Sequence, residues 1–151
     1  MRVGVWGMLG TVLLLACGPG GSGPDDPATC ANPVESEFST VMIGPDGRDP
    51  TDFVPYADGD ELRVVRGLQG SLMAPVRVAL EGPALPECIA QRTVIERDSM
   101  ILAEDDENLQ LFEANGLAVS EALLLIPRGD LRGPVVVTTT VGSTVVQRTL
   151  E

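Results

Sequence analysis

The C-terminal segment constrains the fold of this chain more than any other part of its sequence. Residues 135–141 (VVVTTTV) are an unbroken run of β-branched side chains, which favour strands because their rotation about χ1 is restricted. Residues 144–150 follow as a second, alternating segment, and Gly142-Ser143 lies between the two. A two-residue connection with Gly first is typical of a tight hairpin. The sequence therefore predicts an antiparallel β-hairpin here.

Short apolar segments separated by turn residues make up the rest of the chain beyond residue 34. GPDG at 44–47 and DGD at 58–60 predict turns. Seven or eight short strands, with turns about every 8–12 residues and no long helix, predict an all-β fold. We expect a single antiparallel β-sandwich, immunoglobulin-like, over residues 34–151. Further strands are predicted at residues 38–43, 62–65, 75–81, 92–97, 100–103 and 109–112.

Two of the apolar segments lie at residues 75–81 and 119–126. Residues 75–81 alternate, with apolar side chains on one face and Arg77, Ala79 and Glu81 on the other. This pattern is typical of a half-buried strand in an antiparallel sheet. Residues 119–126 (VSEALLLI) are compatible with a buried strand or with two turns of helix, because periodicity does not separate these alternatives at this length.

Charge and composition exclude several classes of function. The chain has 22 acidic residues against 10 basic ones, all arginine, and its formal net charge is −12. Proteins bind nucleic acid by neutralising phosphates with basic side chains, so we expect no nucleic-acid partner. There is no histidine, which excludes Ser-His-Asp and Cys-His catalysis and removes the ordinary zinc sites. The composition thus favours a non-catalytic protein without a cofactor.

The N-terminus has the organisation of an export signal. Met1-Arg2 provides a short positive start, and residues 3–16 form an apolar run of fourteen residues. This run is shorter than the roughly 20 residues of a membrane-spanning helix, but it has the length of a signal-peptide core. Residues 1–16 are therefore predicted to be a signal peptide.

The end of this run, Leu14-Leu15-Ala16-Cys17, resembles the lipobox of bacterial lipoproteins. The resemblance implies that a diacylglycerol is attached to the Cys17 thiol and that the signal is cleaved between Ala16 and Cys17. A further acyl chain on the new amino group is usual in these proteins, and two or three chains give stable anchoring. The resemblance also implies that Gly18, next to this cysteine, permits export to the outer membrane, as in the lipoproteins of diderm bacteria. The alternative is an ordinary secretory signal with an incidental cysteine.

Residues 17–33 are predicted to be a flexible tether between the lipid and the domain. The segment 18–27 (GPGGSGPDDP) consists almost entirely of residues that block helix and strand. Flexible-chain scaling gives the tether a reach of about 20–24 Å. With Cys17 lipidated, Cys30 and Cys88 remain, and an even pair in an oxidising compartment predicts a disulfide. The alternative is two free thiols.

A second resemblance lies in DGDEL at 58–62, RGLQGS at 66–71 and VRV at 76–78. These residues are similar to a segment of uncharacterised predicted lipoproteins of myxobacteria-like, GC-rich bacteria. There, an Asp-Gly turn precedes a strand, then G-x-Q-G-G-x-H, then a strand holding an Arg between apolar residues. This chain has Ser71 at the second Gly of the triplet and Met73 about where the His stands. The resemblance implies a cellular localisation and a fold, but no activity. The Gly-Leu-Gln-Gly stretch itself predicts a tight turn.

Two acidic clusters are the remaining candidates for chemistry. DGRD at 46–49 with Asp52, and EDDE at 104–107, are predicted to lie in loops between strands. Calcium takes six to eight oxygen ligands and is held by such loops in many proteins. Neither cluster has the alternating acidic positions of an EF-hand, which favours solvated loops over a metal site.

The sequence therefore predicts a lipid-anchored protein of the cell envelope, with the outer membrane favoured. Its β domain would present a non-catalytic binding or structural surface to an envelope or cell-surface protein. The alternative is a calcium-dependent adhesion or ligand-binding module that uses the acidic clusters. The site residues predicted from the sequence are Cys17 for lipidation and Cys30 and Cys88 for the disulfide.

Overall fold

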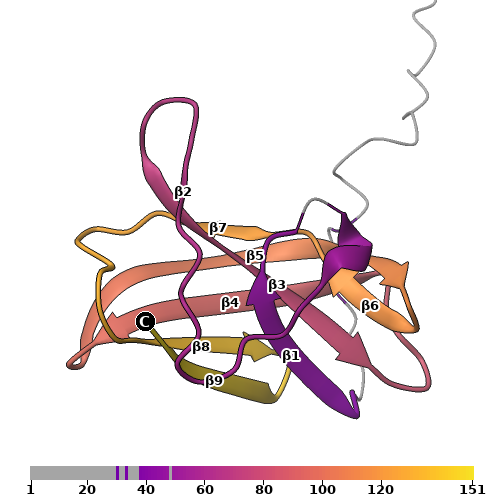
Figure 1. Cartoon of the computed structure of the whole chain (residues 1–151). Helices are drawn as coiled ribbons and strands as arrows, with labels where there is room; N and C mark the ends of the chain where they lie inside the picture. Colours follow the sequence, from indigo (N-terminus) through magenta and orange to yellow (C-terminus); the bar gives the residue numbers. More distant parts are fainter. Residues whose placement is uncertain (1–29, 31–32, 34–37, 48) are drawn as a thin grey trace, which may run out of the picture.

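The computed structural model describes residues 30, 33, 38–47 and 49–151 (Figure 1). The predicted signal peptide, Cys17 and most of the tether lie outside the described residues. Within the described part, regular structure consists of nine strands and one short 3₁₀ helix, η2 (Pro50–Asp52). The strands are β1 (Thr40–Pro45), β2 (Val65–Arg66), β3 (Leu72–Glu81), β4 (Cys88–Arg97), β5 (Met100–Ala114), β6 (Leu117–Ser120), β7 (Leu123–Leu125), β8 (Val135–Val141) and β9 (Thr144–Leu150). Across these residues, no helix has the length and apolar character needed to cross a membrane.

The strands form one continuous antiparallel sheet in the order β1-β3-β6-β5-β4-β8-β9, with β2 and β7 also paired to β3. The all-β, antiparallel prediction is confirmed. The sandwich detail is not confirmed, because β5 passes from one half of this single sheet to the other. Its residues 100–110 pair with β4, and its residues 111–114 pair with β6. The immunoglobulin-like arrangement stays a prediction.

The two edges of the sheet are joined by a segment that we call the edge strap, residues 56–62. The amide of Tyr56 donates to the carbonyl of Ile43 in β1 at 2.8 Å. Further along the strap, the amide of Gly59 donates to the carbonyl of Thr149 in β9 at 2.8 Å. The strap therefore brings β1 and β9 close together and occupies backbone groups that an exposed edge would leave free. Figure 1 shows the resulting curled sheet.

The main core lies inside the curl and consists of aliphatic side chains from almost every strand. The largest fully buried ones are Ile43, Leu80, Ile89, Ile95, Leu123, Leu125 and Leu150. A second, smaller apolar cluster lies on the outer face, where Met42 and Phe53 pack against Ala79, Ala114 and Val119. Both faces of β3 are therefore covered.

The prediction that residues 75–81 form a half-buried strand is wrong, because both faces of β3 are covered. Arg77 is 3% exposed and Ala79 is fully buried. The segment that contains Phe53 and Val54 lies directly on the outer face of β1. A Cβ atom on Gly44 would lie 2.4 Å from the Val54 carbonyl oxygen, so glycine is required for this close approach.

The acidic run 104–107 lies in the middle of β5 rather than in a loop. Pairing with β4 along ten positions makes one long strand out of the two short ones that were predicted at 100–103 and 109–112. Within residues 119–126, residues 119–120 end β6 and residues 123–125 form β7, so the strand alternative is confirmed. The C-terminal hairpin has the predicted bounds, and Gly142 in its turn has a φ of +56°.

A buried polar chain closes the gap between β6 and β7. The amide of Val78 in β3 donates to the hydroxyl of Ser120, the last residue of β6, at 3.0 Å. Inside the core, the Gln91 amide donates to the Thr93 hydroxyl at 3.1 Å, and that hydroxyl lies 2.9 Å from the hydroxyl of Thr139. All buried side-chain polar atoms in the described residues have partners, as a stable interior requires.

Candidate functional site

Of the three cysteines singled out from the sequence, Cys30 and Cys88 are joined by a disulfide. Their Cα atoms lie 5.5 Å apart, and both residues are buried. Cys88 is the first residue of β4, so the bond fixes the end of the predicted tether to a central strand. Cys17 lies outside the described residues.

The first acidic cluster surrounds a buried cation. The Arg77 guanidinium donates from Nε to the carbonyl of Ser120 at 2.9 Å and from Nη1 to the carbonyl of Asp49 at 3.4 Å. Burial lowers the pKa of Arg77, and the charges of Asp46, Asp49 and Asp52 act in the opposite direction. This cluster therefore balances the charge of Arg77 inside the fold.

Asp49 has a second role, because it begins the short helix η2. Its carboxylate accepts hydrogen bonds from the amide of Thr51 at 2.9 Å and from the hydroxyl of Thr51 at 2.8 Å. These bonds, the backbone one first, lower the pKa of Asp49. The carboxylate is thus an N-cap, a common structural use of aspartate at such a position.

The second acidic cluster follows the pleat of β5, so neighbouring side chains point to opposite faces of the strand. Glu104 forms an ion pair with Arg92 on β4, and this hydrogen bond raises the pKa of Arg92. Among the residues that the structure describes, no group of three or more His, Cys, Asp or Glu side chains is placed to hold a metal ion. The calcium-dependent alternative stays a prediction without a site that favours it.

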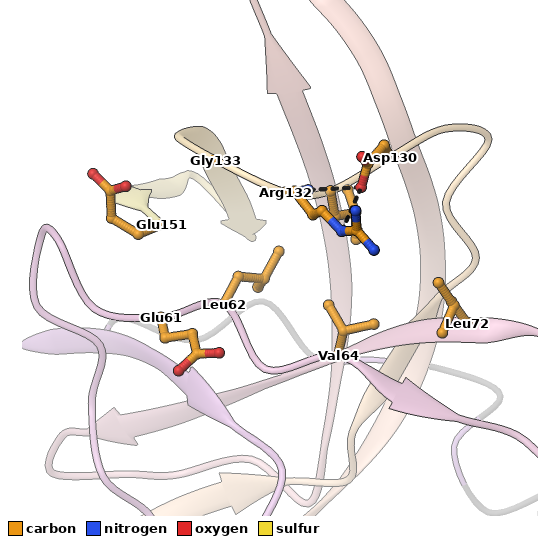
Figure 2. A pocket seen from close by; sticks show the side chains of 9 residues that line it. Glu61, Leu62, Val64, Leu72, Asp130, Arg132, Gly133 and Glu151 are labelled. Atoms are coloured by element: carbon orange, nitrogen blue, oxygen red, sulfur yellow. Dashed lines mark hydrogen bonds and ion pairs between the residues drawn. The ribbon is translucent and has the colours of Figure 1, made fainter.

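The candidate site is a groove of about 560 Å³ between the edge strap, the 130–133 loop and the start of β3 (Figure 2). Leu62 and Leu131 are buried, whereas Val64 and Leu72 are partly exposed. Figure 2 shows Leu62 and Val64 on the side opposite Asp130 and Arg132. Nine residues line the groove: Glu61, Leu62, Val64, Leu72, Asp130, Leu131, Arg132, Gly133 and Glu151.

Backbone hydrogen bonds hold the strap side of the groove. The amide of Leu62 donates to the carbonyl of Glu151 at 2.9 Å, and the amide of Glu151 donates to the carbonyl of Asp60 at 2.8 Å. These two bonds extend the edge of β9 onto the strap. They place the carboxylates of Glu61 and Glu151 at the same rim of the groove.

Arg97 at the end of β4 holds the opposite side. Its guanidinium donates to four carbonyl oxygens of the 130–134 segment, including that of Pro134 at 3.0 Å and that of Asp130 at 3.3 Å. Charge-assisted bonds of this kind are stronger than neutral ones. The loop that carries Asp130 and Arg132 is therefore attached to the sheet, and the groove is formed by rigid elements on both sides.

The groove combines an apolar floor with an acidic rim. Glu61, Asp130 and Glu151 supply three carboxylates against the single guanidinium of Arg132. Arg132 and Asp130 form an exposed ion pair with 3.9 Å between Nε and Oδ1. The lining contains no Ser, Thr, Cys, Lys or Tyr. This chemistry suits the binding of an apolar group that carries a positive charge nearby.

A projecting hairpin, which we call the arm, extends from the edge of the groove. The arm comprises residues 64–73, with β2 on one side and the beginning of β3 on the other (Figure 1). The amide of Gly67 donates to the carbonyl of Ser71 at 2.8 Å, and Gly70 has a φ of +82°. The tight turn predicted for the Gly-Leu-Gln-Gly stretch is confirmed, and Leu68 at its tip is fully exposed.

A scan against protein-family models finds no match for this chain, and neither the curated proteins nor the solved structures give one. No sequence pattern predicted the groove, and of the arm only its tight turn was predicted. The available signal was Leu68, an apolar residue at the centre of a glycine-rich turn, where polar residues are more common.

Proposed function

We propose that this chain is a lipid-anchored protein of the bacterial cell envelope whose β domain is a non-catalytic binding module. The observation that carries the binding role is the groove, in which rigid elements hold an apolar floor beneath a rim of carboxylates. Exposed apolar surface of this kind marks an interaction site in many soluble domains. The lining offers no nucleophile with an adjacent base, which favours binding over catalysis.

The anchoring part of the proposal is supported by the sequence at the N-terminus. The lipobox resemblance ends in Cys17, and the apolar run before it has the length of a signal peptide. A tether with a reach of about 20–24 Å would hold the domain just beyond the lipid headgroups. Gly18 favours delivery to the outer membrane within this proposal.

A Cys17→Ser substitution should release the protein from the membrane. A serine hydroxyl cannot take the thioether-linked diacylglycerol, and without acyl chains the acidic domain has no affinity for a lipid surface. We expect the wild-type chain to sediment with membranes, partition into detergent and incorporate radiolabelled palmitate. We expect the variant to do none of these.

Ser22→Ala, a change within the tether that leaves the lipobox intact, is the control and should behave like the wild type. Equal release of the wild type and of Cys17→Ser into the soluble fraction would contradict the anchoring proposal. The test does not depend on which molecule occupies the groove.

A further inference from the structure

We propose that the groove is occupied by the arm of a second copy of this chain, in a reciprocal two-fold dimer. This inference rests on the proposed use of the groove as a binding surface, and it names the partner. The surface consists of the arm, residues 64–73, together with the rim residues Glu61, Asp130 and Glu151.

The arm carries apolar side chains that the rest of its own chain does not cover. Leu68 is fully exposed, Leu72 is 47% exposed and Val64 is 38% exposed. A single exposed leucine is ordinary on a protein surface, but here three exposed aliphatic residues belong to one short projecting hairpin. Covering these side chains would remove apolar surface from water, which is the main driving force of association.

The charge of the arm indicates that an acidic surface would bind it. Residues 64–73 contain Arg66 and no acidic residue, although the chain as a whole has a net charge of −12. Arg66 lies two positions from Leu68, so a cation accompanies the exposed leucine at the tip. The groove offers the complementary combination, an apolar floor with three carboxylates at its rim. The groove of a second copy is therefore complementary to the arm tip in both polarity and charge.

The geometry makes the exchange reciprocal. Val64 and Leu72 belong both to the arm and to the lining of the groove, so the groove lies at the base of the arm. If two arms lie antiparallel across a two-fold axis, each tip reaches the base of the other. Leu68 lies in the turn at the tip, and Leu72 begins β3 at the base of the arm, so the two contacts would be equivalent in both copies. Such an isologous contact closes at two subunits and does not propagate.

Anchoring and charge are compatible with this contact. Two copies held in one membrane by short tethers meet at a higher effective concentration than they would in solution. The repulsion between two acidic domains is screened beyond about 8 Å at physiological ionic strength, whereas the arm and groove would meet at closer range.

The test is photo-crosslinking of the full chain in living cells, with a benzophenone amino acid at position 68. We expect irradiation to produce a crosslinked homodimer, identified by mass and by co-purification of two differently tagged copies. The matched control places the same group at Val145 on β9, which is also exposed but lies outside the arm and the groove. Position 145 should give monomer only.

Charge reversal gives a second measurement that local misfolding would not reproduce. Arg66→Glu should lower the yield of the position 68 crosslink at least fivefold, and Arg66→Glu combined with Glu61→Arg should restore it. A crosslink from position 68 to a different protein, or no crosslink, would overturn the second copy as the partner. The anchoring of the protein is judged separately by the Cys17→Ser fractionation, so the two failures are distinguishable.

Discussion

A Cys30→Ser/Cys88→Ser double variant should be less stable than the wild type by about 4 kcal/mol in free energy of unfolding. The disulfide closes a loop of 58 residues, and a covalent loop of that length removes much of the conformational freedom of the unfolded chain. The expected readout is a lower midpoint of urea unfolding, followed by circular dichroism near 218 nm, a wavelength of β-sheet absorption.

Reduction of the wild type provides the control for this experiment. The reduced wild type should unfold at nearly the same urea concentration as the double variant, because both lack the same bond. Equal midpoints for the oxidised wild type and the double variant would contradict this prediction. The bond would then connect residue 30 to β4 without contributing to the stability of the domain.

An Arg77→Ala substitution should destabilise the domain by roughly 2–4 kcal/mol. It removes the hydrogen bonds to the carbonyls of Ser120 and Asp49 in a buried setting. It also leaves Asp46, Asp49 and Asp52 without the cation that they face. The loss should appear as a lower unfolding midpoint and as faster proteolysis of the segment that covers β1 and β3.

Arg92→Ala is the matched control, because it removes an arginine from an exposed ion pair on the same sheet. An exposed pair contributes little to stability because solvent screens it, so this variant should unfold close to the wild type. Equal losses for Arg77→Ala and Arg92→Ala would contradict the assignment of Arg77 as a buried, charge-balanced contact.

Local signals in the sequence were enough to predict some elements closely. The hairpin of β8 and β9 has its predicted bounds, because an unbroken β-branched run, a Gly-Ser turn and a second strand all agree. The turn at 67–70 is also local and was predicted for the same reason. These elements depend on neighbours within a few residues.

Other elements depend on partners far along the chain and could not be predicted in the same way. Acidic residues at 104–107 suggested a loop, but pairing with β4 holds them in a strand and Arg92 balances Glu104. The burial of Arg77 depends on the covering segment around Phe53, whose position no pattern within 75–81 reveals. Tertiary contacts override local preference in both cases.

The groove was beyond prediction for a related reason. Its lining comes from the strap, the start of β3, the loop after β7 and the end of β9, which the curl of the sheet brings together. Arg97 holds the loop by donating to backbone carbonyl oxygens. Every residue has such an acceptor, so the sequence does not indicate which carbonyls an arginine will contact. The disulfide was predicted because Cys30 and Cys88 are the two cysteines that remain when Cys17 is assigned to the lipid.

The central claim, that this domain is held to a membrane by lipid on Cys17, is tested most directly by the mass of the mature protein. The tagged chain would be purified from bacterial membranes and measured intact, and its N-terminal peptide would then be sequenced by fragmentation. We predict a chain that begins at Cys17 and carries a diacylglyceryl group together with one further acyl chain. A chain that begins at another residue, or an unmodified Cys17, would contradict the account.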